Sequence, residues 1–376
     1  KYTFTRNGFG SHKSCGPLCC MILAIAVPLT LIIPNVILSF TESMGFWGGM
    51  ANVLLPMGVI GLLMTLSRRT GISALWFFPI MILSAFQIVL LFLYGESLIA
   101  VDMFLNVVTT NPQEVEELLG NLVSAILTVV IIYLPVIVLA IVAAVKRWRL
   151  DVLVRDAYRT VAASVAMIGL VAMVVSYFIT PSFGITRDIF PINGLTNLGI
   201  AVQRSIDMAN YTKTSADWIY EAQSERADTV PEVYILVIGE TTRADNWQLA
   251  GYGRETNPRL SQSDNLVFFN RALTQSNTTH KSVPMLLSSL TADDFGENIN
   301  RRKGLITAFN EAGYDTYFFS NQRRNHSYID HFGEEADTHV FIKEDGKEHY
   351  DEELLPLLAQ ALADDGNPNK LIVRDT

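Results

Sequence analysis

The sequence has few cysteines, and none after position 20. All three, Cys15, Cys19 and Cys20, precede the first long apolar run. The region from residue 180 onward therefore cannot form an internal disulfide, and cysteine usage leaves the cellular compartment open. A long basic stripe is also missing, and the formal net charge is -9. Nothing in the charge pattern indicates a nucleic-acid partner.

The surplus of apolar residues lies almost entirely before residue 180. The chain has 376 residues, half of them hydrophobic, and a mean hydropathy of +0.28. This length and composition predict two domains, one of them in a membrane. We expect residues 1–20 to be an N-terminal segment of uncertain structure and residues 21–179 to cross the bilayer five times, each crossing about 20 residues long. The five predicted spans are Met21–Phe40, Phe46–Leu66, Ile72–Tyr94, Leu122–Val145 and Val161–Ile179.

Basic residues are absent from two of the connections between these spans. Residues 41–45 and 95–121 contain no Lys or Arg, whereas Arg68 and Arg69 separate the second span from the third, and five basic residues lie between 146 and 159. The positive-inside rule then places the N-terminus in the cytoplasm. Five crossings deliver everything after residue 180 to the outer side, which is the periplasm in a Gram-negative cell. The spans carry almost no charge, which argues against a transporter.

The remainder of the chain divides into a bridge and a mixed domain. Residues 180–230 combine short amphipathic pieces with Pro, Gly and aromatics, as expected of either a bridge on the membrane surface or a plain linker. Residues 231–376 alternate strands and helices, which predicts a three-layer α/β domain around a largely parallel sheet. The predicted strands are Val233–Ile238, Leu266–Phe269, Asp315–Phe319, His339–Ile342 and Lys370–Val373, and the predicted helices are Ser282–Ser289, Gly304–Ala312 and Glu352–Ala363.

The stretch Val233–Pro258 carries the first functional signal. Six apolar residues, Val233–Ile238, predict a strand buried on both faces, and Glu240 follows at its carboxyl end, where open α/β sheets bind ligands. Glu240 and Asp245 offer oxygens to a metal ion, and Arg243 offers a cation to a phosphate. From these residues alone, a solvated polar loop after a buried strand remains an alternative.

The string GETTRADNWQLAGYGRETNP within this stretch closely resembles the first metal-ligand motif of the membrane-bound phosphoethanolamine transferases, a branch of the alkaline phosphatase and sulfatase superfamily. The resemblance implies a five-helix transmembrane domain followed by an α/β sulfatase-like domain. It also implies a zinc cofactor with Glu240 among its ligands.

A second signal lies in Ser276–Leu290, SNTTHKSVPMLLSSL. A hydroxyl just ahead of a helix can bond to a phosphoryl group that the helix N-terminus stabilises, although such residues more commonly act as N-caps. When the chain is aligned on the triplet Ser282–Pro284, the resemblance places Thr279 at the family's nucleophilic threonine, which is also a zinc ligand. Thr278 is the alternative if the register differs by one.

Two further stretches resemble parts of the family that hold the lipid donor. Asn106, Thr110 and Glu114 are spaced four and four, so a helix would present them on one side. Helix capping by residues 111–114 is an equally simple explanation. The resemblance implies that the three residues contact the ethanolamine headgroup, and a carboxylate facing an ammonium makes Glu114 the preferred contact.

The loop Ser320–His331 is the other such stretch. Its composition alone is compatible with a solvated basic turn. The resemblance implies contacts to the phosphate of the donor from Arg324, Asn325 and His326, although this loop departs from better-known members in its residues.

The family takes its remaining zinc ligands from an Asp-His pair and a further Asp that follow a late strand of the catalytic domain. Here the corresponding strand, Lys370–Val373, is followed by three residues only, and the pair Asp330 and His331 lies too early in the chain to replace them. We therefore expect the catalytic domain, 231–376, to be incomplete and the chain to be a truncated form.

The resulting functional prediction is a zinc-dependent enzyme of the bacterial inner membrane with a periplasmic catalytic domain. It would transfer phosphoethanolamine from phosphatidylethanolamine to a lipopolysaccharide acceptor, with a phosphate of lipid A as the expected acceptor group, through a phospho-threonine intermediate. Such transfer reduces the negative charge of the envelope and its attraction for polymyxins. The alternatives are a phosphoglycerol transferase of the lipoteichoic-acid-synthase type and a non-catalytic remnant.

Overall fold

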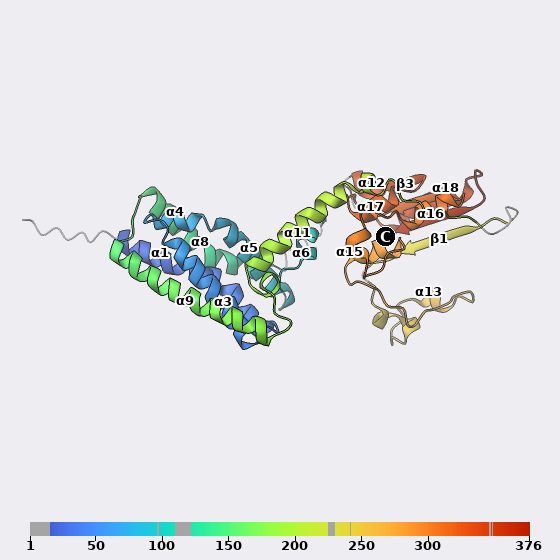
Figure 1. Cartoon of the computed structure of the whole chain (residues 1–376). Coiled ribbons are helices and arrows are strands. Elements are labelled where there is room, and N and C mark those ends of the chain that lie inside the picture. Colours follow the sequence, from blue (N-terminus) through green and yellow to red (C-terminus); the bar gives the residue numbers. More distant parts are fainter. Residues whose placement is uncertain are drawn as a thin grey trace, which may run out of the picture. The chain divides into compact units, whose positions relative to one another are not determined.

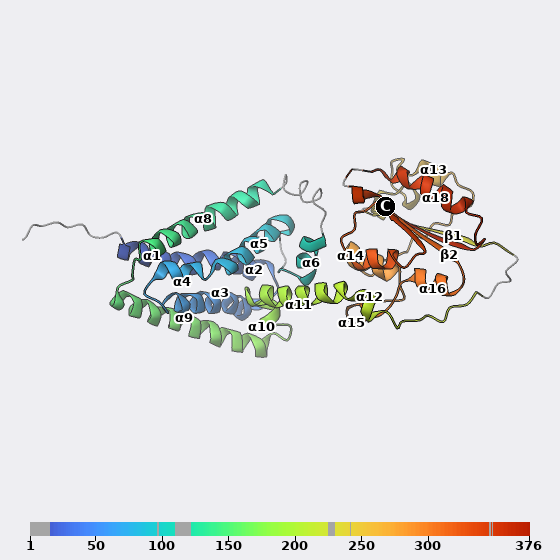
Figure 2. The same cartoon turned by 90° about the horizontal axis from the view of Figure 1, so that it is seen from above.

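The chain folds into two compact units in a computed structural model. The structure describes residues 16–95, 98–109, 122–224, 230–240, 242–345, 347 and 349–376. The first unit comprises Lys1–Val108 and Pro112–Val202, and the second consists chiefly of Gln203–Thr376. Figure 1 and Figure 2 show the helices of the first unit and the sheet of the second.

The first unit is built from apolar helices. Its helices are α1 (Gly16–Leu31), α2 (Ile33–Thr41), α3 (Gly45–Met64), α4 (Thr70–Leu75), α5 (Phe78–Tyr94), α6 (Val101–Thr109), α8 (Val123–Val145), α9 (Val152–Ile179), α10 (Ile185–Asp188) and the first part of α11 (Ile192–Ala209). Four stretches among the described residues are long and apolar enough to cross a membrane: Gly16–Thr41, Gly45–Met64, Val123–Val145 and Val152–Ile179. The chain is therefore a multi-pass membrane protein.

The predicted third span differs most from the structure. Instead of one helix over Ile72–Tyr94, the chain forms the short α4 and then α5, with a turn at Trp76 and Phe77 just ahead of Pro79. Proline lacks the N–H of a continuing helix and restricts the residue before it, which explains the interruption. The apolar part of α5 covers only Phe78–Leu93, so the count of five full-length spans is not confirmed.

Helices α3 and α9 pack unusually closely, and both views show them side by side (Figure 1, Figure 2). A Cβ added at Gly58 of α3 would lie 2.3 Å from the backbone nitrogen of Ala166, and one added at Gly169 of α9 would lie 2.3 Å from that of Leu55. Any side chain at these two positions would overlap the neighbouring backbone. The two glycines therefore allow the close contact, as small residues do in membrane helix pairs.

A buried amide pair fixes the chain that leads into α11. Asn35 of α2 donates to the backbone oxygen of Phe190 at 2.6 Å and to the side-chain oxygen of Asn52 in α3 at 2.9 Å. The same Asn52 oxygen accepts from the backbone N–H of Phe190 at 3.0 Å. Both backbone groups of Phe190 are thus satisfied where no water is available.

The second unit is a three-layer α/β domain with a parallel sheet. Its strands are β1 (Val233–Ile238), β2 (Asp315–Ser320), β3 (Thr338–Phe341) and β4 (Lys370–Asp375), in the order β1-β4-β2-β3. All three pairings are parallel, with Ile238 beside Asp375 and Asp375 beside Ser320. The helices are α12 (Tyr211–Thr214), α13 (Pro258–Ser261), α14 (Thr279–Leu286), α15 (Phe295–Asn298), α16 (Leu305–Glu311), α17 (Tyr328–Gly333) and α18 (Leu354–Ala363).

Alternate residues of β2 and β4 bury opposite faces of the sheet. Phe318 and Leu371 pack in a cluster with residues of α14, α16 and α17, whereas Tyr317 and Ile372 pack against α18. Figure 2 shows α16 and α18 on opposite sides of the strands. This period of two is what places helices on both faces of a parallel sheet.

Two strand predictions are wrong in part or whole. The strand β1 has the predicted bounds, but it lies at an edge of the described sheet, and most of its residues, including Val233 and Val237, are exposed. Leu266–Phe269 forms no strand, and Val267 and Phe269 are 74% and 77% exposed. The β-branched and aromatic residues of this segment match the composition of a strand. Strand propensity depends mainly on packing against neighbouring strands, so the composition alone does not make a strand where no partner is present.

Helix α12 is anchored to the second unit by a buried carboxylate. The Tyr211 hydroxyl lies 2.7 Å from the Glu335 carboxylate, which also accepts from the backbone N–H of Gly304 and the hydroxyl of Thr307, both at 2.8 Å. Burial raises the pKa of Glu335, and these hydrogen bonds oppose the rise. The Tyr211 ring stacks on His331 at 5.1 Å.

Candidate active site

The structure brings Glu240 and Thr279 together from two elements 39 residues apart. Glu240 directly follows β1, and Thr279 is the first residue of α14. The Thr279 hydroxyl donates a hydrogen bond of 2.8 Å to Oε1 of Glu240, and both residues are exposed. A hydroxyl and a carboxylate therefore converge at the carboxyl end of a parallel strand, where ligands of open α/β sheets bind.

The neighbouring Thr278 has a different environment. It is the N-cap of α14, in extended backbone, and its hydroxyl lies 3.1 Å from that of Ser276. Only Thr279 of the two has a hydrogen bond to Glu240. The Thr279 hydroxyl also lies at the N-terminus of the eight-residue α14, where backbone N–H groups of the first turn favour an anion.

A second carboxylate, Asp375, lies at the end of the neighbouring strand β4. It is paired with Ile238 of β1, and its side chain accepts a 2.8 Å hydrogen bond from Ser320 of β2. Burial raises the pKa of Asp375 to about 6, Ser320 opposes the rise, and the negative charge of Glu240 adds to it. The sequence interpretation missed this residue, although a carboxylate ending an apolar strand beside β1 is the pattern that singled out Glu240.

The three predicted phosphate contacts already have partners within the second unit. Arg324 lies 3.3 Å from Glu334 and 3.1 Å from Glu344, and its guanidinium lies over the ring of Phe341 at 4.5 Å. The backbone N–H groups of Asn325 and His326 donate to Asp330 at 2.7 and 2.6 Å. A phosphate bound to Arg324 would compete with two carboxylates.

Asp330 and His331 have local structural roles. The buried Asp330 closes the loop before α17 by accepting from two backbone N–H groups, and burial raises its pKa. His331 stacks on Tyr211. That the pair does not replace the family's Asp-His ligands stays a prediction.

The predicted headgroup contacts are largely beyond the described part of the chain. Asn106 lies in α6, but its side chain is outside the described residues, as are Thr110 and Glu114. Their contact with a lipid headgroup stays a prediction.

The Glu240 and Thr279 pair fits part of a zinc site. Both residues present accessible oxygen atoms, and the Glu240 carboxylate is a group that binds zinc. A catalytic zinc normally has about three protein ligands. Within the ranges that the structure describes, no three His, Cys, Asp or Glu residues are arranged to hold a metal ion.

Comparison with known proteins places this geometry in a class. Residues 232–374 match the Sulfatase family model. The lipooligosaccharide phosphoethanolamine transferase A (EptA) of Neisseria meningitidis, an integral membrane protein, superposes with a TM-score of 0.62 at 18% identity, covering 95% of this chain and 68% of that chain. The chain thus combines membrane helices with a sulfatase-like domain in the fold of that protein.

The curated relatives narrow the class. YhbX of Escherichia coli K12, which its name gives only as a transferase, is 32% identical over 203 residues, covering 52% of this chain and 35% of the relative. Phosphatidylethanolamine transferase Mcr-2 of Escherichia coli is 38% identical over 92 residues (23% and 17%), and phosphoethanolamine transferase EptA of Escherichia coli K12 is 36% identical over 88 residues (23% and 16%). The chain spans about a third of the length of the first of these relatives and less of the others.

These matches confirm the resemblance read from the sequence. The chain is similar to the membrane-bound phosphoethanolamine transferases of the alkaline phosphatase and sulfatase superfamily.

Proposed function

We propose that the second unit transfers phosphoethanolamine from phosphatidylethanolamine to a phosphate of lipid A, with Thr279 as the group that carries it. The observation that supports this proposal is the 2.8 Å hydrogen bond from the Thr279 hydroxyl to Glu240 at the N-terminus of α14. The names of the relatives, several of them phosphoethanolamine or phosphatidylethanolamine transferases, support the reaction class.

Two displacements at phosphorus make up the reaction. In the first, Thr279 Oγ1 forms a bond to the donor's phosphorus while the bond from phosphorus to the glycerol oxygen breaks. The hydroxyl proton moves toward Glu240, and the departing diacylglycerol oxygen takes up a proton. In the second, an acceptor phosphate oxygen forms a bond to the same phosphorus while the bond from phosphorus to Thr279 Oγ1 breaks, and Thr279 takes back the proton that Glu240 had accepted.

The residues of this chain hold the reacting atoms in place. Glu240 orients the Thr279 hydroxyl and accepts its proton, and the first turn of α14 stabilises the negative charge on the phosphoryl oxygens. Glu240 and Thr279 would also hold zinc, which when bound lowers the pKa of a coordinated hydroxyl. Asn106, Thr110, Glu114, Arg324, Asn325 and His326 stay our proposed donor contacts. We place the domain on the periplasmic side of the inner membrane, so transfer to lipid A would lower the envelope's attraction for polymyxins.

The adjacent threonine offers a matched control for the nucleophile. The full chain, in vesicles of phosphatidylethanolamine labelled in its headgroup and supplied with zinc, is expected to acquire covalent label at Thr279. Thr279→Ala should lose the label, because no other atom replaces Oγ1. Thr278→Ala should retain it, because the Thr278 hydroxyl contacts Ser276 and not Glu240. Label on Thr279→Ala, or none on the unaltered chain, would reject the proposal.

A further inference from the structure

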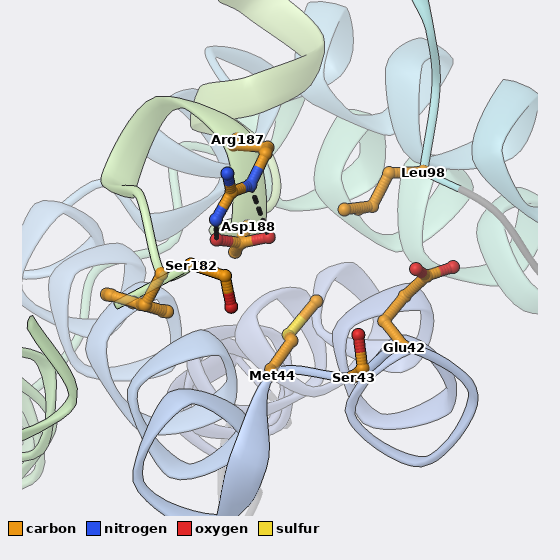
Figure 3. Close-up of a pocket in the computed structure, with 8 residues that line it drawn as sticks. Glu42, Ser43, Met44, Leu98, Ser182, Arg187 and Asp188 are labelled. Carbon is orange, nitrogen blue, oxygen red and sulfur yellow. Dashed lines mark hydrogen bonds and ion pairs between the residues drawn. The ribbon is translucent and has the colours of Figure 1, made fainter. Parts of the chain in front are cut away.

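Two largely buried carboxylates of the protein accept hydrogen bonds on both of their oxygens. In the first unit, a cavity of about 230 Å³ lies between Glu42, Leu98 and Arg187. Figure 3 shows Arg187 paired with Asp188 there. Asp188 accepts from Nε of Arg187 on Oδ1 at 3.2 Å and from a backbone N–H on Oδ2 at 2.7 Å. In the second unit, Glu335 likewise accepts on both oxygens. These partners account for both carboxylates.

Asp375 of the second unit differs, because one of its two oxygens has no hydrogen-bond donor among the described residues. Its Oδ2 accepts from the Ser320 hydroxyl at 2.8 Å, and Ser320 in turn accepts from the backbone N–H of Gln322 at 3.1 Å. Oδ1 accepts none, although the residue is only 7% exposed. A buried carboxylate oxygen without a donor costs free energy, and a bound ion or water is a common reason for its presence.

Asp375 lies on the face of the sheet that carries α14. Val373 of β4 packs in one cluster with Ile238 of β1 and Val283 of α14. Side chains alternate along a strand, so Asp375, two residues after Val373, continues this row toward the carboxyl end of β4. Helix α14 begins at Thr279, whose hydroxyl is bonded to the second residue after β1. The row therefore leads toward the edge of the sheet where the Thr279 hydroxyl lies.

The ends of β4 and β1 are tied together next to Glu240. Asp375 is the register partner of Ile238, and Thr376 donates to the Ile238 backbone oxygen from its N–H at 3.1 Å and from its hydroxyl at 2.9 Å. Glu240 follows Ile238 by two residues. Burial raises the pKa of Asp375 to about 6, and the negative charge of Glu240 adds to the rise. Two carboxylates that interact in this way repel each other unless a proton or a cation is shared between them.

We propose that Asp375 is a further ligand of the cation that Glu240 and Thr279 would hold, through its Oδ1 atom, while Ser320 fixes the orientation of the carboxylate. Metal-binding carboxylates are themselves hydrogen-bonded in this way. The set has two carboxylates and one hydroxyl, which is compatible with the absence, among the described residues, of three His, Cys, Asp or Glu side chains arranged for a metal. Asp375 ends β4, so it is not one of the ligands that the family resemblance places after this strand. The inference deepens the proposed function, on which it rests for the site, but it requires only a bound cation.

Zinc titration of the detergent-solubilised full chain, in competition with a zinc-binding dye of known affinity, tests the ligand. We expect one zinc ion per chain. Asp375→Asn keeps the shape of the side chain but removes its charge. It should weaken zinc binding at least about 100-fold, because even the loss of an outer partner of a metal ligand costs about 10–100-fold. Ser320→Ala keeps the carboxylate, removes its hydrogen bond and should weaken zinc binding about tenfold.

A second measurement and a matched control separate a lost ligand from a damaged fold. Thermal unfolding in EDTA should show Asp375→Asn to be more stable than the unaltered chain, because the variant lacks a buried charge. Weaker zinc binding by a more stable variant cannot come from unfolding. Asp364 is the control: its carboxylate also accepts from a hydroxyl, that of Tyr317 at 2.7 Å, but it follows α18 and precedes β4. Asp364→Asn should leave the zinc affinity unchanged.

The inference would be overturned by zinc binding to Asp375→Asn as tight as to the unaltered chain, by an equal loss in Asp364→Asn, or by a loss in Asp375→Asn that accompanies lower stability in EDTA. Failure of the unaltered chain to bind one zinc ion would overturn it as well. The covalent label tests the proposed function separately. Zinc binding that depends on Asp375 in a chain that acquires no label would support the ligand and reject Thr279 as the nucleophile. Label at Thr279 with zinc binding unaffected by Asp375→Asn would do the reverse.

Discussion

Replacement of Asp375 by asparagine is expected to stabilise the sheet of the second unit at neutral pH. Burial raises the pKa of this carboxyl from 3.8 to about 6. Because the folded pKa lies above the unfolded one, the stability gained from the protonated carboxyl is present below pH 3.8 and is lost as the pH rises through 6. Each pKa unit is worth about 1.4 kcal/mol, so ionised Asp375 costs the folded state ~3 kcal/mol above pH 7. Asparagine does not ionise and avoids this cost.

Hydrogen exchange in the amides of β2 measures the effect in the full chain. These amides belong to the strand next to β4, so their protection reports opening of the sheet. With EDTA present, Asp375→Asn should raise protection about 100-fold at pH 7.5 but only ~10-fold at pH 5, where part of the cost is already relieved.

An exposed carboxylate of the same unit supplies the control. Hydrogen bonds, chiefly from Tyr317, lower the pKa of Asp364. Its stabilising effect therefore has the opposite pH dependence, and Asp364→Asn should reduce protection at neutral pH. Equal protection of Asp375→Asn and the unaltered chain at both pH values, or lower protection in the variant, would refute the reasoning about burial.

Two further substitutions test packing. Tyr211→Phe removes a hydrogen bond to the buried Glu335 and should destabilise the second unit by about 1–3 kcal/mol, visible as faster exchange in β2; an unchanged rate would contradict the anchoring role. Gly169→Leu forces a side chain into the backbone of α3 and should cost about 1–3 kcal/mol or more, lowering the unfolding temperature in detergent. Gly199→Leu, with open space around its Cβ position, should not, and equal effects of the two would refute the close-contact explanation.

Strong local patterns predicted the bounds of β1 and the nearness of Glu240 to Thr279. The strand β1 has the predicted bounds, Val233–Ile238. The structure also brings Glu240 and Thr279, which are 39 residues apart in the sequence, into hydrogen-bond contact. An apolar run followed by a polar loop indicates both the strand and the position of the loop residues, because parallel strands bring their carboxyl ends to the same edge of the sheet.

Features that depend on tertiary context could not be predicted. An apolar run does not say whether its strand is central or at an edge, so the exposure of β1 was missed. The role of Asp375 depends on its neighbours Ser320 and Ile238, which come from strands distant in sequence. The cavity between Glu42, Leu98 and Arg187 is lined by residues of three separate segments, and no local spacing relates Glu42 to Arg187.

The order of the strands sets the order of events during synthesis. Within the described residues, β1 pairs with β4 alone, and β4 also supplies the link to β2. More than a hundred residues separate the end of β1 from the start of β4, which takes on the order of 10 s to translate at bacterial rates. Throughout that interval the nascent β1 has no partner. Exposure of an apolar, unpaired strand ahead of its partner makes this segment the point at which a holding chaperone would be most needed.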